Sequence, residues 1–484
     1  MKLNVVTAAS AIMLGFVSAA SAVEINQSGA DALKGNLTRL LPKEVAPNRA
    51  ITVKPAGTRY EIISDFEKML KAARPANFAI SGLVPWSIFA TPQDDGLWKL
   101  EGNNALDVTG HFSVAGQPRT DFTYVIGSAI FSGIFDPAIS YLRSGDFSTK
   151  ALRFTSKTAA ENVAVALDSS TYKLTSSPSS APERTNFAVS GTALGFVETI
   201  GGHEIPPVEI RADSLDLAAA VNGIKAKEIR DIVVFILDHA ETEKLKPADS
   251  DTLKTMLRNA FPLVTSLNET IGVNNLTISS TGGNGGAKSL DYNVALDGPT
   301  NAMRFGFGMS ARQISFDSPL VPAAYSAFLP DALQMQFALS DMDFTAFSEE
   351  LLKADFNQDK MSDDSGKEAA QKLFKDGNLV MEFPKIAASS SVYDAEISGT
   401  VRGRLDNEKE YSMEATILAR DLDRTIAAVQ DLAKSNPDLN QLSFGLMMAK
   451  GFAKTDPDGR QRWEINVARD GAVSVNGQVI KGAE

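Results

Sequence analysis

Apolar and polar residues alternate over long stretches of this chain, with the period of two that is typical of half-buried β-strands. The segment 303–309 is the clearest case, because Phe305 and Phe307 alternate there with glycine. Glycine on one face of a strand favours a strong bend or the close approach of another backbone. Further alternating segments are 105–114, 122–126, 163–167, 172–174 and 290–296.

Helical patterns are fewer and do not follow every strand, which argues against a parallel α/β fold. Beyond those that follow an aspartate, the helices expected are 224–242, 251–267 and 367–375. The sequence predicts an α+β fold with large curved antiparallel β-sheets and a few packed helices.

An aspartate stands between an alternating segment and a helical pattern at several points. Asp216, Asp343 and Asp423 share their spacing from the last apolar strand residue, and Asp65 lies in a more degenerate copy. A carboxylate at such a junction accepts hydrogen bonds from free N–H groups of the first helical turn. We predict repeated strand-Asp-helix modules with helices over 66–73, 217–221, 344–354 and 424–435; the alternative is that any strand-to-helix junction attracts aspartate.

The N-terminus has the pattern of a secretory signal peptide. Lys2 precedes an apolar run over residues 5–17, and Ala20-Ser21-Ala22 is a small-x-small cleavage site. The alternative is a retained anchor, but the run is well short of the roughly 20 residues needed to span a bilayer. We expect cleavage after Ala22, a periplasmic location and no transmembrane span in the mature protein.

The chain has 484 residues, which is too long for one ordinary core. We expect a signal peptide over 1–22 and three α+β modules, N-terminal (23–180), middle (181–328) and C-terminal (329–484). The last should end in a β-meander, because Asp470-Gly471 and Asn476-Gly477 suit tight turns between short strands.

The net charge of −12 makes nucleic acid and anionic lipid headgroups poor candidates for partners. An acidic exported protein is compatible with neutral partners, such as a lipid held by its apolar part or an envelope protein. The chain contains no cysteine, so no disulfide stabilises it. A bacterial periplasm tolerates this absence, which fits a Gram-negative cell envelope.

No catalytic or cofactor-binding motif is present. The three histidines have no zinc-site spacing, and no G-x-S-x-G elbow occurs. Asp355, Asn357 and Asp359 have the spacing of a calcium loop, but Lys360 and Gly366 replace its glycine and its bidentate glutamate. These three residues are weak calcium candidates, and a solvated acidic loop is the alternative; we name no catalytic residue, no cofactor and no other metal ligand.

The aromatic residues are dominated by phenylalanine, with 26 Phe against 8 Tyr and 3 Trp. Surfaces that bind sugars usually rely on exposed Trp and Tyr, so this balance argues against them. Phenylalanine and methionine on one face of long strands could instead line a groove for lipid chains, and the alternative is an ordinary core. The candidate groove residues are Met303, Phe305, Phe307, Met335 and Phe337.

Several stretches of the chain resemble a proteobacterial periplasmic family that carries a domain of unknown function and is loosely similar to AsmA-like envelope proteins. These stretches are Leu329-Pro330-Asp331-Ala332-Leu333, residues 369–386, residues 397–403, Asp470-Gly471 and Asn476-Gly477. The resemblance implies an envelope role connected with outer-membrane lipid homeostasis. It supplies no catalytic residue.

Three functions therefore stay open. The first is a non-enzymatic periplasmic protein that binds an apolar, lipid-like ligand or an envelope partner. The second is a structural or interaction scaffold of the envelope without a small ligand. The third is a hydrolase whose site is assembled in space, which two acidic residues and a Ser or His in one pocket would favour.

Overall fold

The computed structural model describes residues 24–38, 50–73, 77–114, 118–137, 141–203, 206–239, 244–353, 363–375 and 377–483. The described chain separates into two compact units, one ending at Thr265 and one beginning at Ser266. The predicted signal peptide lies outside the described residues. The three predicted modules stay a prediction; their boundary at 180/181 falls between two strands that pair with each other, β8 and β9.

The first unit is built around antiparallel strands, in the order β1-β2-β4-β5-β6-β7-β8-β9-β10, with β3 beside the far end of β5. The strands are β1 (Ile51–Ala56), β2 (Arg59–Ser64), β3 (Phe78–Ser81), β4 (Trp86–Pro92), β5 (Trp98–Phe112), β6 (Thr120–Asp136), β7 (Tyr141–Lys157), β8 (Glu161–Pro178), β9 (Thr185–Gly202) and β10 (Val208–Ile224). The helices are α2 (Gln27–Thr38), α3 (Phe66–Ala73), α4 (Ala226–Asp238) and α5 (Pro247–Ala260).

The core of the first unit lies where α2 packs on the early strands. Leu33 and Leu37 of α2 are buried in one cluster with Phe135 and Leu142 from the ends of β6 and β7. Tyr60 belongs to the same cluster, and its hydroxyl donates to the backbone carbonyl of Glu24 at 2.9 Å. The helix therefore covers the apolar face of the sheet at this end.

The second unit is also antiparallel, in the order β11-β12-β13-β14-β15-β16-β17-β19-β20-β21, and β18 pairs with β19. The strands are β11 (Ser266–Ser280), β12 (Gly283–Asp297), β13 (Met303–Asp317), β14 (Ala332–Met342), β15 (Asn378–Ser389), β16 (Asp394–Arg404), β17 (Asn407–Arg420), β18 (Lys454–Thr455), β19 (Gln461–Val467), β20 (Val473–Val475) and β21 (Gln478–Lys481). The helices are η2 (Ala323–Phe328), α6 (Phe344–Leu351), α7 (Asp363–Leu373), α8 (Leu422–Ala433) and α9 (Leu439–Phe452).

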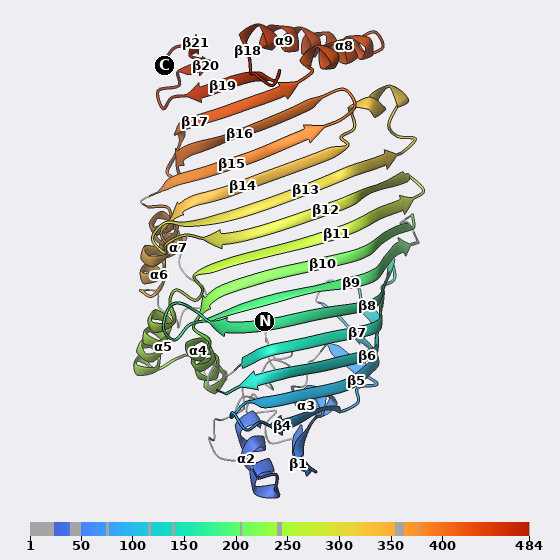
Figure 1. Ribbon diagram of the computed structural model, residues 1–484, viewed down its shortest axis with the longest axis vertical. Helices are drawn as coiled ribbons and strands as arrows, with labels where there is room; N and C mark the ends of the chain where they lie inside the picture. The colour runs from blue at the N-terminus through green and yellow to red at the C-terminus, as the bar shows by residue number, and fades with distance from the viewer. Residues whose placement is uncertain are drawn as a thin grey trace. The chain divides into compact units, whose positions relative to one another are not determined.

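Helices of the second unit lie mainly at the ends and at the edge of its strands. Figure 1 shows α6 and α7 beside one end of the strands, and α8 and α9 next to the last strands. The unit is thus mostly antiparallel sheet with a few helices, which confirms the predicted α+β class in its coarse form. At its C-terminal end β19, β20 and β21 pair in sequence order, and Asn476 and Gly477 have φ values of 51° and 83°, as a tight turn between β20 and β21 requires.

The predicted aspartate junctions differ among themselves. Asp65 and Asp343 accept hydrogen bonds from the backbone N–H groups of Lys68 and Ala346, so both cap a helix as predicted. Asp423 instead lies inside the first turn of α8, which begins at Leu422.

The prediction at Asp216 was wrong, because residues 217–221 continue β10 and form no helix. The Asp216 carboxylate accepts a hydrogen bond of 2.6 Å from the Thr192 hydroxyl on β9. The Asp216 carboxylate therefore binds a residue of the neighbouring strand and does not cap a helix.

Several long strands change the phase of their alternation in the middle. Ala151 in β7 and Gly195 in β9 have positive φ, as have Asn275 in β11 and Gln313 in β13. Ala151 has no register partner, since Leu152 and Lys150 pair with Leu167 and Ser169. An unpaired residue with positive φ interrupts the two-residue repeat. The apolar positions of β7 therefore change from odd numbers before Ala151 to even numbers after it.

Candidate functional site

The predicted groove residues lie on neighbouring strands of the second unit. Phe307 stands directly opposite Phe337, and the backbone register places Met335 opposite Met309. Because side chains alternate along a strand, Met303, Phe305 and Phe307 share one face with Met335 and Phe337. The structure thus brings the five candidates together on one face of β13 and β14.

The same face carries apolar residues across most strands of the second unit. One row of directly opposed residues crosses β11–β17 and β19, namely Ile271, Tyr292, Met309, Met335, Ile386, Ile397, Ile417 and Trp463. A second row on these strands is Leu267, Leu296, Phe305, Leu339, Met381, Val401, Met413 and Val467. We call these two rows and the residues between them the apolar face.

The apolar face is only partly covered. The side chains of Tyr292, Phe305 and Phe337 are 36%, 39% and 36% exposed, whereas Met303 is 3% exposed. The rings of Tyr292 and Phe307 meet edge to face, with centroids 5.1 Å apart. Phe305 and Phe337 therefore offer surface to a ligand, and Met303 contributes little beyond packing.

The helices α8 and α9 cover the apolar face at its C-terminal end. Trp463 packs in a cluster with Leu422 and Ile426 of α8, and Leu446 of α9 adds to it. The indole Nε1 of Trp463 donates to the carbonyl oxygen of Ala449 at 2.7 Å. This hydrogen bond satisfies the polar group of the tryptophan and fixes α9 over β19.

Charged groups of these strands lie mainly on the opposite face. Glu382 accepts hydrogen bonds from Ser340 Oγ at 2.5 Å and from Arg304 Nε at 3.0 Å. Burial raises the pKa of Glu382, but the hydrogen bonds from Ser340 and Arg304 outweigh it and hold the pKa below its ordinary value. The two faces of the sheet thus differ sharply in polarity.

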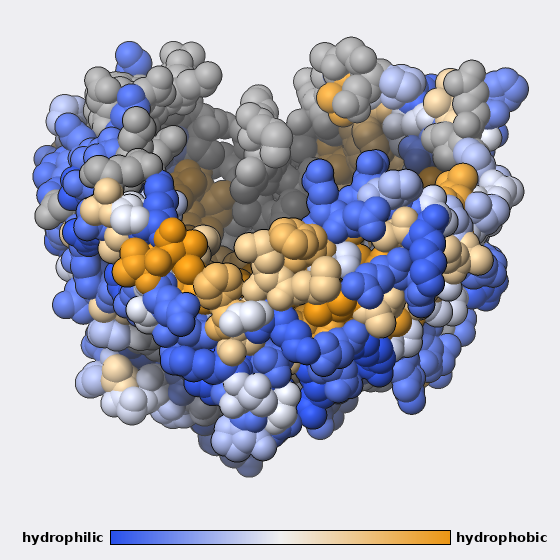
Figure 2. All heavy atoms as spheres, turned by 90° about the horizontal axis from the view of Figure 1, so that it is seen from above, coloured by the Kyte–Doolittle hydropathy of each residue, from blue (hydrophilic) through white to orange (hydrophobic). Residues whose placement is uncertain are grey.

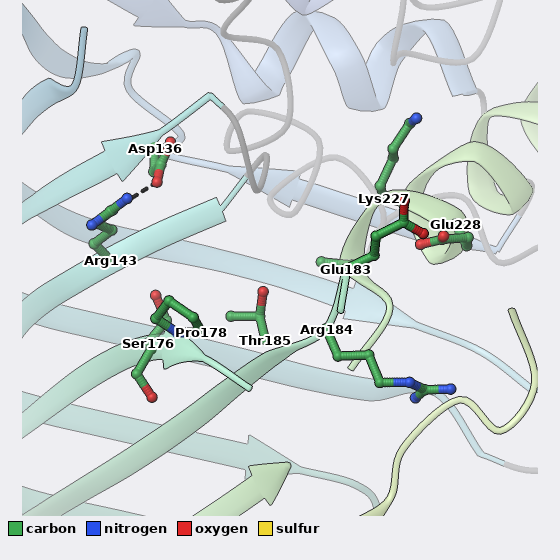
Figure 3. A pocket seen from close by; sticks show the side chains of 11 residues that line it. Asp136, Arg143, Ser176, Pro178, Glu183, Arg184, Thr185, Lys227 and Glu228 are labelled. Carbon is green, nitrogen blue, oxygen red and sulfur yellow. Dashed lines mark hydrogen bonds and ion pairs between the residues drawn. The ribbon is translucent and has the colours of Figure 1, made fainter. Parts of the chain in front are cut away.

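A second candidate is a polar pocket of the first unit, with a volume of about 270 Å³. It lies where β6 and β8 end and β7, β9 and α4 begin, and Figure 3 shows the side chains that line it. These are Asp136, Arg143, Ser176, Ser177, Pro178, Glu183, Arg184, Thr185, Ala226, Lys227 and Glu228.

The charges of this pocket are partly paired within the protein. Arg143 Nε donates to the buried Asp136 carboxylate at 2.6 Å. Arg184 donates to the carbonyl oxygens of Gly223 and Pro262 and so holds the chain before α4 to the chain after α5. Glu228 Oε2 is buried and has no hydrogen-bond partner in the described chain.

The pocket brings hydroxyl and carboxylate groups together, as the hydrolase hypothesis requires, but in the described chain these groups are not joined by hydrogen bonds that could activate a hydroxyl. No hydrogen bond joins the hydroxyl of Ser176, Ser177 or Thr185 to a carboxylate among the described residues. No histidine is among the lining residues. The sequence did not predict this pocket, because its residues come from separate stretches of the chain and form no local motif.

The C-terminal end of the second unit exposes further apolar residues. Figure 2 looks onto this end and shows apolar side chains gathered between polar ones. The helix α9 leaves large apolar side chains exposed, and of its residues only Ser443 is fully buried. The exposed apolar residues of α9 and β21 are Leu442, Phe444, Met447, Met448, Phe452, Val479 and Ile480.

Metal chemistry gains no support from the geometry. The calcium candidates Asp355, Asn357 and Asp359 lie outside the described residues. Within the described ranges, no group of three or more histidine, aspartate or glutamate side chains is placed to hold a metal ion. No helix in the described part of the chain is both long and apolar enough to cross a membrane.

Comparison of the chain with protein-family models, with curated proteins and with solved structures finds no match in any of the three.

Proposed function

We propose that this protein is a non-enzymatic periplasmic protein that binds a lipid-like ligand on the apolar face of its second unit. The observation that carries the proposal is the pair of apolar rows that cross eight strands in direct register. A sheet normally buries such a face against a second layer. Here Phe305 and Phe337 near the centre remain more than a third exposed.

The dimensions of the apolar face suit hydrocarbon chains. Neighbouring strands lie about 4.8 Å apart, so a row across eight strands is about 34 Å long. This length is close to the ~30 Å thickness of the hydrocarbon core of a bilayer. Contiguous apolar surface that is left partly exposed is typical of ligand-binding and interaction sites.

The expected periplasmic location supports the same function. A signal peptide over residues 1–22 would deliver the chain to the periplasm, where lipids in transit between membranes need an apolar binding surface. The resemblance to AsmA-like envelope proteins also points to lipid homeostasis. The negative net charge favours recognition of acyl chains over that of anionic headgroups.

Mass spectrometry of organic extracts tests the proposal directly. The mature protein would be purified from a bacterial periplasm without detergent and extracted with organic solvent. We expect a phospholipid or fatty acid in near-stoichiometric amount. A lipid-free extract, together with no binding of a fluorescent octadecenoic acid in solution, would overturn the proposal.

Variants locate the binding surface. Phe305→Ser and Phe337→Ser each remove one exposed ring, and the loss of ~1–2 kcal/mol of apolar contact corresponds to about tenfold weaker binding of the fluorescent fatty acid. Leu320→Ser is the matched control, because Leu320 is 82% exposed and lies in the loop between β13 and β14. Equal affinities for the wild type and both Phe variants would remove the apolar face as the site.

A structural scaffold is the second candidate, and the exposed residues of α9 and β21 favour it. In the described chain β21 pairs with β20 alone, and an open strand edge pairs readily with another extended strand. The first partner to test is a second copy of this chain. Sedimentation velocity should show a dimer that Ile480→Glu abolishes, and a monomer at every concentration would exclude this form of the scaffold.

A further inference from the structure

A polar groove lies on the face of β12, β13 and β14 that is opposite the apolar face. The alternation that turns Phe305 and Phe307 to one face turns Gly306 and Gly308 to the other. A Cβ built on Gly308 would have no neighbour closer than 3.7 Å, so ordinary van der Waals space lies open above this glycine. The missing side chains leave a hollow of about 300 Å³.

Planar polar side chains form the walls of this groove. Asn293 and Gln336 flank Gly308 in direct register, and Asp291, Ser310 and Gln334 form the next row. Arg304 closes the other end.

Some of these polar side chains form hydrogen bonds within the protein, and others do not. Ser310 donates to Asp291 at 3.2 Å, and Asn293 donates to the carbonyl of Glu269 at 3.0 Å. Gln334 and Gln336 are half-buried, and in the described part of the chain no hydrogen bond engages their side-chain amides. Each amide still offers two donors and one acceptor oxygen to a ligand.

The charges of the groove are balanced. The guanidinium of Arg304 is paired with Glu382, and the carboxylate of Asp291 stands opposite it along the groove. A lining with one cation, one anion and several neutral amides does not select a charged ligand. It suits a neutral ligand with many neighbouring hydroxyl groups, because each planar amide or carboxylate can bind two adjacent hydroxyls at once.

We propose that this groove binds one or two sugar residues of a neutral glycan. Its volume is at the lower end of the range for small-molecule sites, ~300–1,000 Å³. The scarcity of Trp and Tyr argues against recognition by stacked rings, and the walls of the groove recognise hydroxyls by hydrogen bonds instead. The proposal is independent of lipid binding, which uses the opposite face.

Saturation-transfer NMR on the full mature chain tests the proposal with maltose, lactose and N,N′-diacetylchitobiose as probes. Each probe would be present at about 20 mM, well above a Kd of ~1 mM that a few hydrogen bonds give. We expect at least one probe to bind. Gln336→Ala should weaken that binding about threefold to tenfold, and Gly308→Leu should fill the groove and abolish it.

The matched control is Gly403→Leu on β16, where an added Cβ also has no neighbour closer than 3.7 Å and which lies outside the groove. It should bind sugar as the wild type does. Thermal unfolding of each variant verifies folding, and binding of the fluorescent fatty acid should be the same in the wild type, Gln336→Ala and Gly308→Leu. Absence of binding by all three probes, or binding that survives Gly308→Leu in a folded protein, overturns the proposal without bearing on lipid binding.

Discussion

The ring of Phe383 on β15 lies over Gly399, the residue directly opposite it on β16. A Cβ built on Gly399 would stand 2.6 Å from Phe383 Cζ and would also meet the carbonyl oxygen of Glu414 on β17. Phe383 is only 7% exposed and so has little freedom to move away. Glycine at this position is thus required by packing between strands and not by a turn.

Gly399→Ala should therefore destabilise the protein. The added methyl group overlaps both a buried ring and a backbone oxygen, and overpacking of this kind costs about 1–3 kcal/mol. Urea unfolding monitored by circular dichroism measures the loss of unfolding free energy.

Gly403→Ala is the control on the same strand. Its added Cβ would find its nearest neighbour, Tyr411 Cβ, at 3.7 Å, so no overlap arises. Replacing a strand glycine without strain reduces the entropy of the unfolded chain and is neutral or stabilising by up to about 1 kcal/mol. Equal losses at Gly399 and Gly403 would contradict the packing argument.

Asp343→Ala should destabilise α6 by about 1 kcal/mol, because the Asp343 carboxylate accepts the backbone N–H of Ala346 at 2.9 Å. Asp343→Asn keeps an acceptor oxygen and should recover most of the stability. Asp423→Ala is the comparison, since its 80% exposed carboxylate binds Lys450 at the surface and is expected to contribute less than about 0.5 kcal/mol. A larger loss at Asp423 than at Asp343 in thermal unfolding would refute the assignment of the cap.

The sequence predicted the strands well wherever the alternation keeps one phase. The segments 163–167 and 172–174 were expected as separate strands, yet both belong to β8. Asp168 lies between them, next to the positive-φ residues Ala151 on β7 and Gly195 on β9, and there the apolar positions of β8 change from odd to even numbers. A positive φ in the middle of a strand is a tertiary feature, and the alternation pattern cannot distinguish it from a loop.

In the candidate site, too, the sequence predicted the local pattern and not the features that depend on the tertiary structure. The alternation that places Phe305 and Phe307 on one face of β13 is local, so the period of two identified these residues. The rows that cross the strands from Met309 to Trp463 and from Phe305 to Val467 depend on the register of the strands, which only the fold sets. The pocket around Asp136 and Glu228 and the groove above Gly308 are likewise assembled from separate segments of the chain and could not be predicted from spacing.

The Glu382 carboxylate should make stability depend on pH in the acid range. Its pKa in the folded protein lies below the ordinary value of 4.5, so the unfolded state takes up a proton first as the pH falls. The stabilisation by Arg304 and Ser340 is therefore present above about pH 4.5 and is lost as the pH falls through the folded pKa. Glu382→Gln should flatten this part of the profile of unfolding free energy against pH; a profile identical to that of the wild type would refute the role of Glu382.

Trp463→Phe should loosen α9 more than it unfolds the sheet. Phenylalanine keeps most of the apolar contact with Leu422 and Ile426 but removes the 2.7 Å hydrogen bond to the Ala449 carbonyl, which costs about 1 kcal/mol. Because α9 buries few of its own apolar residues, this bond is one of the few contacts that hold it over β19, together with the bond from Asn476 Nδ2 to the Phe452 carbonyl at 2.7 Å. Hydrogen exchange should therefore speed up in 439–452 with little change in 378–404, and an equal increase in both segments would show that Trp463 supports the whole unit instead of the helix.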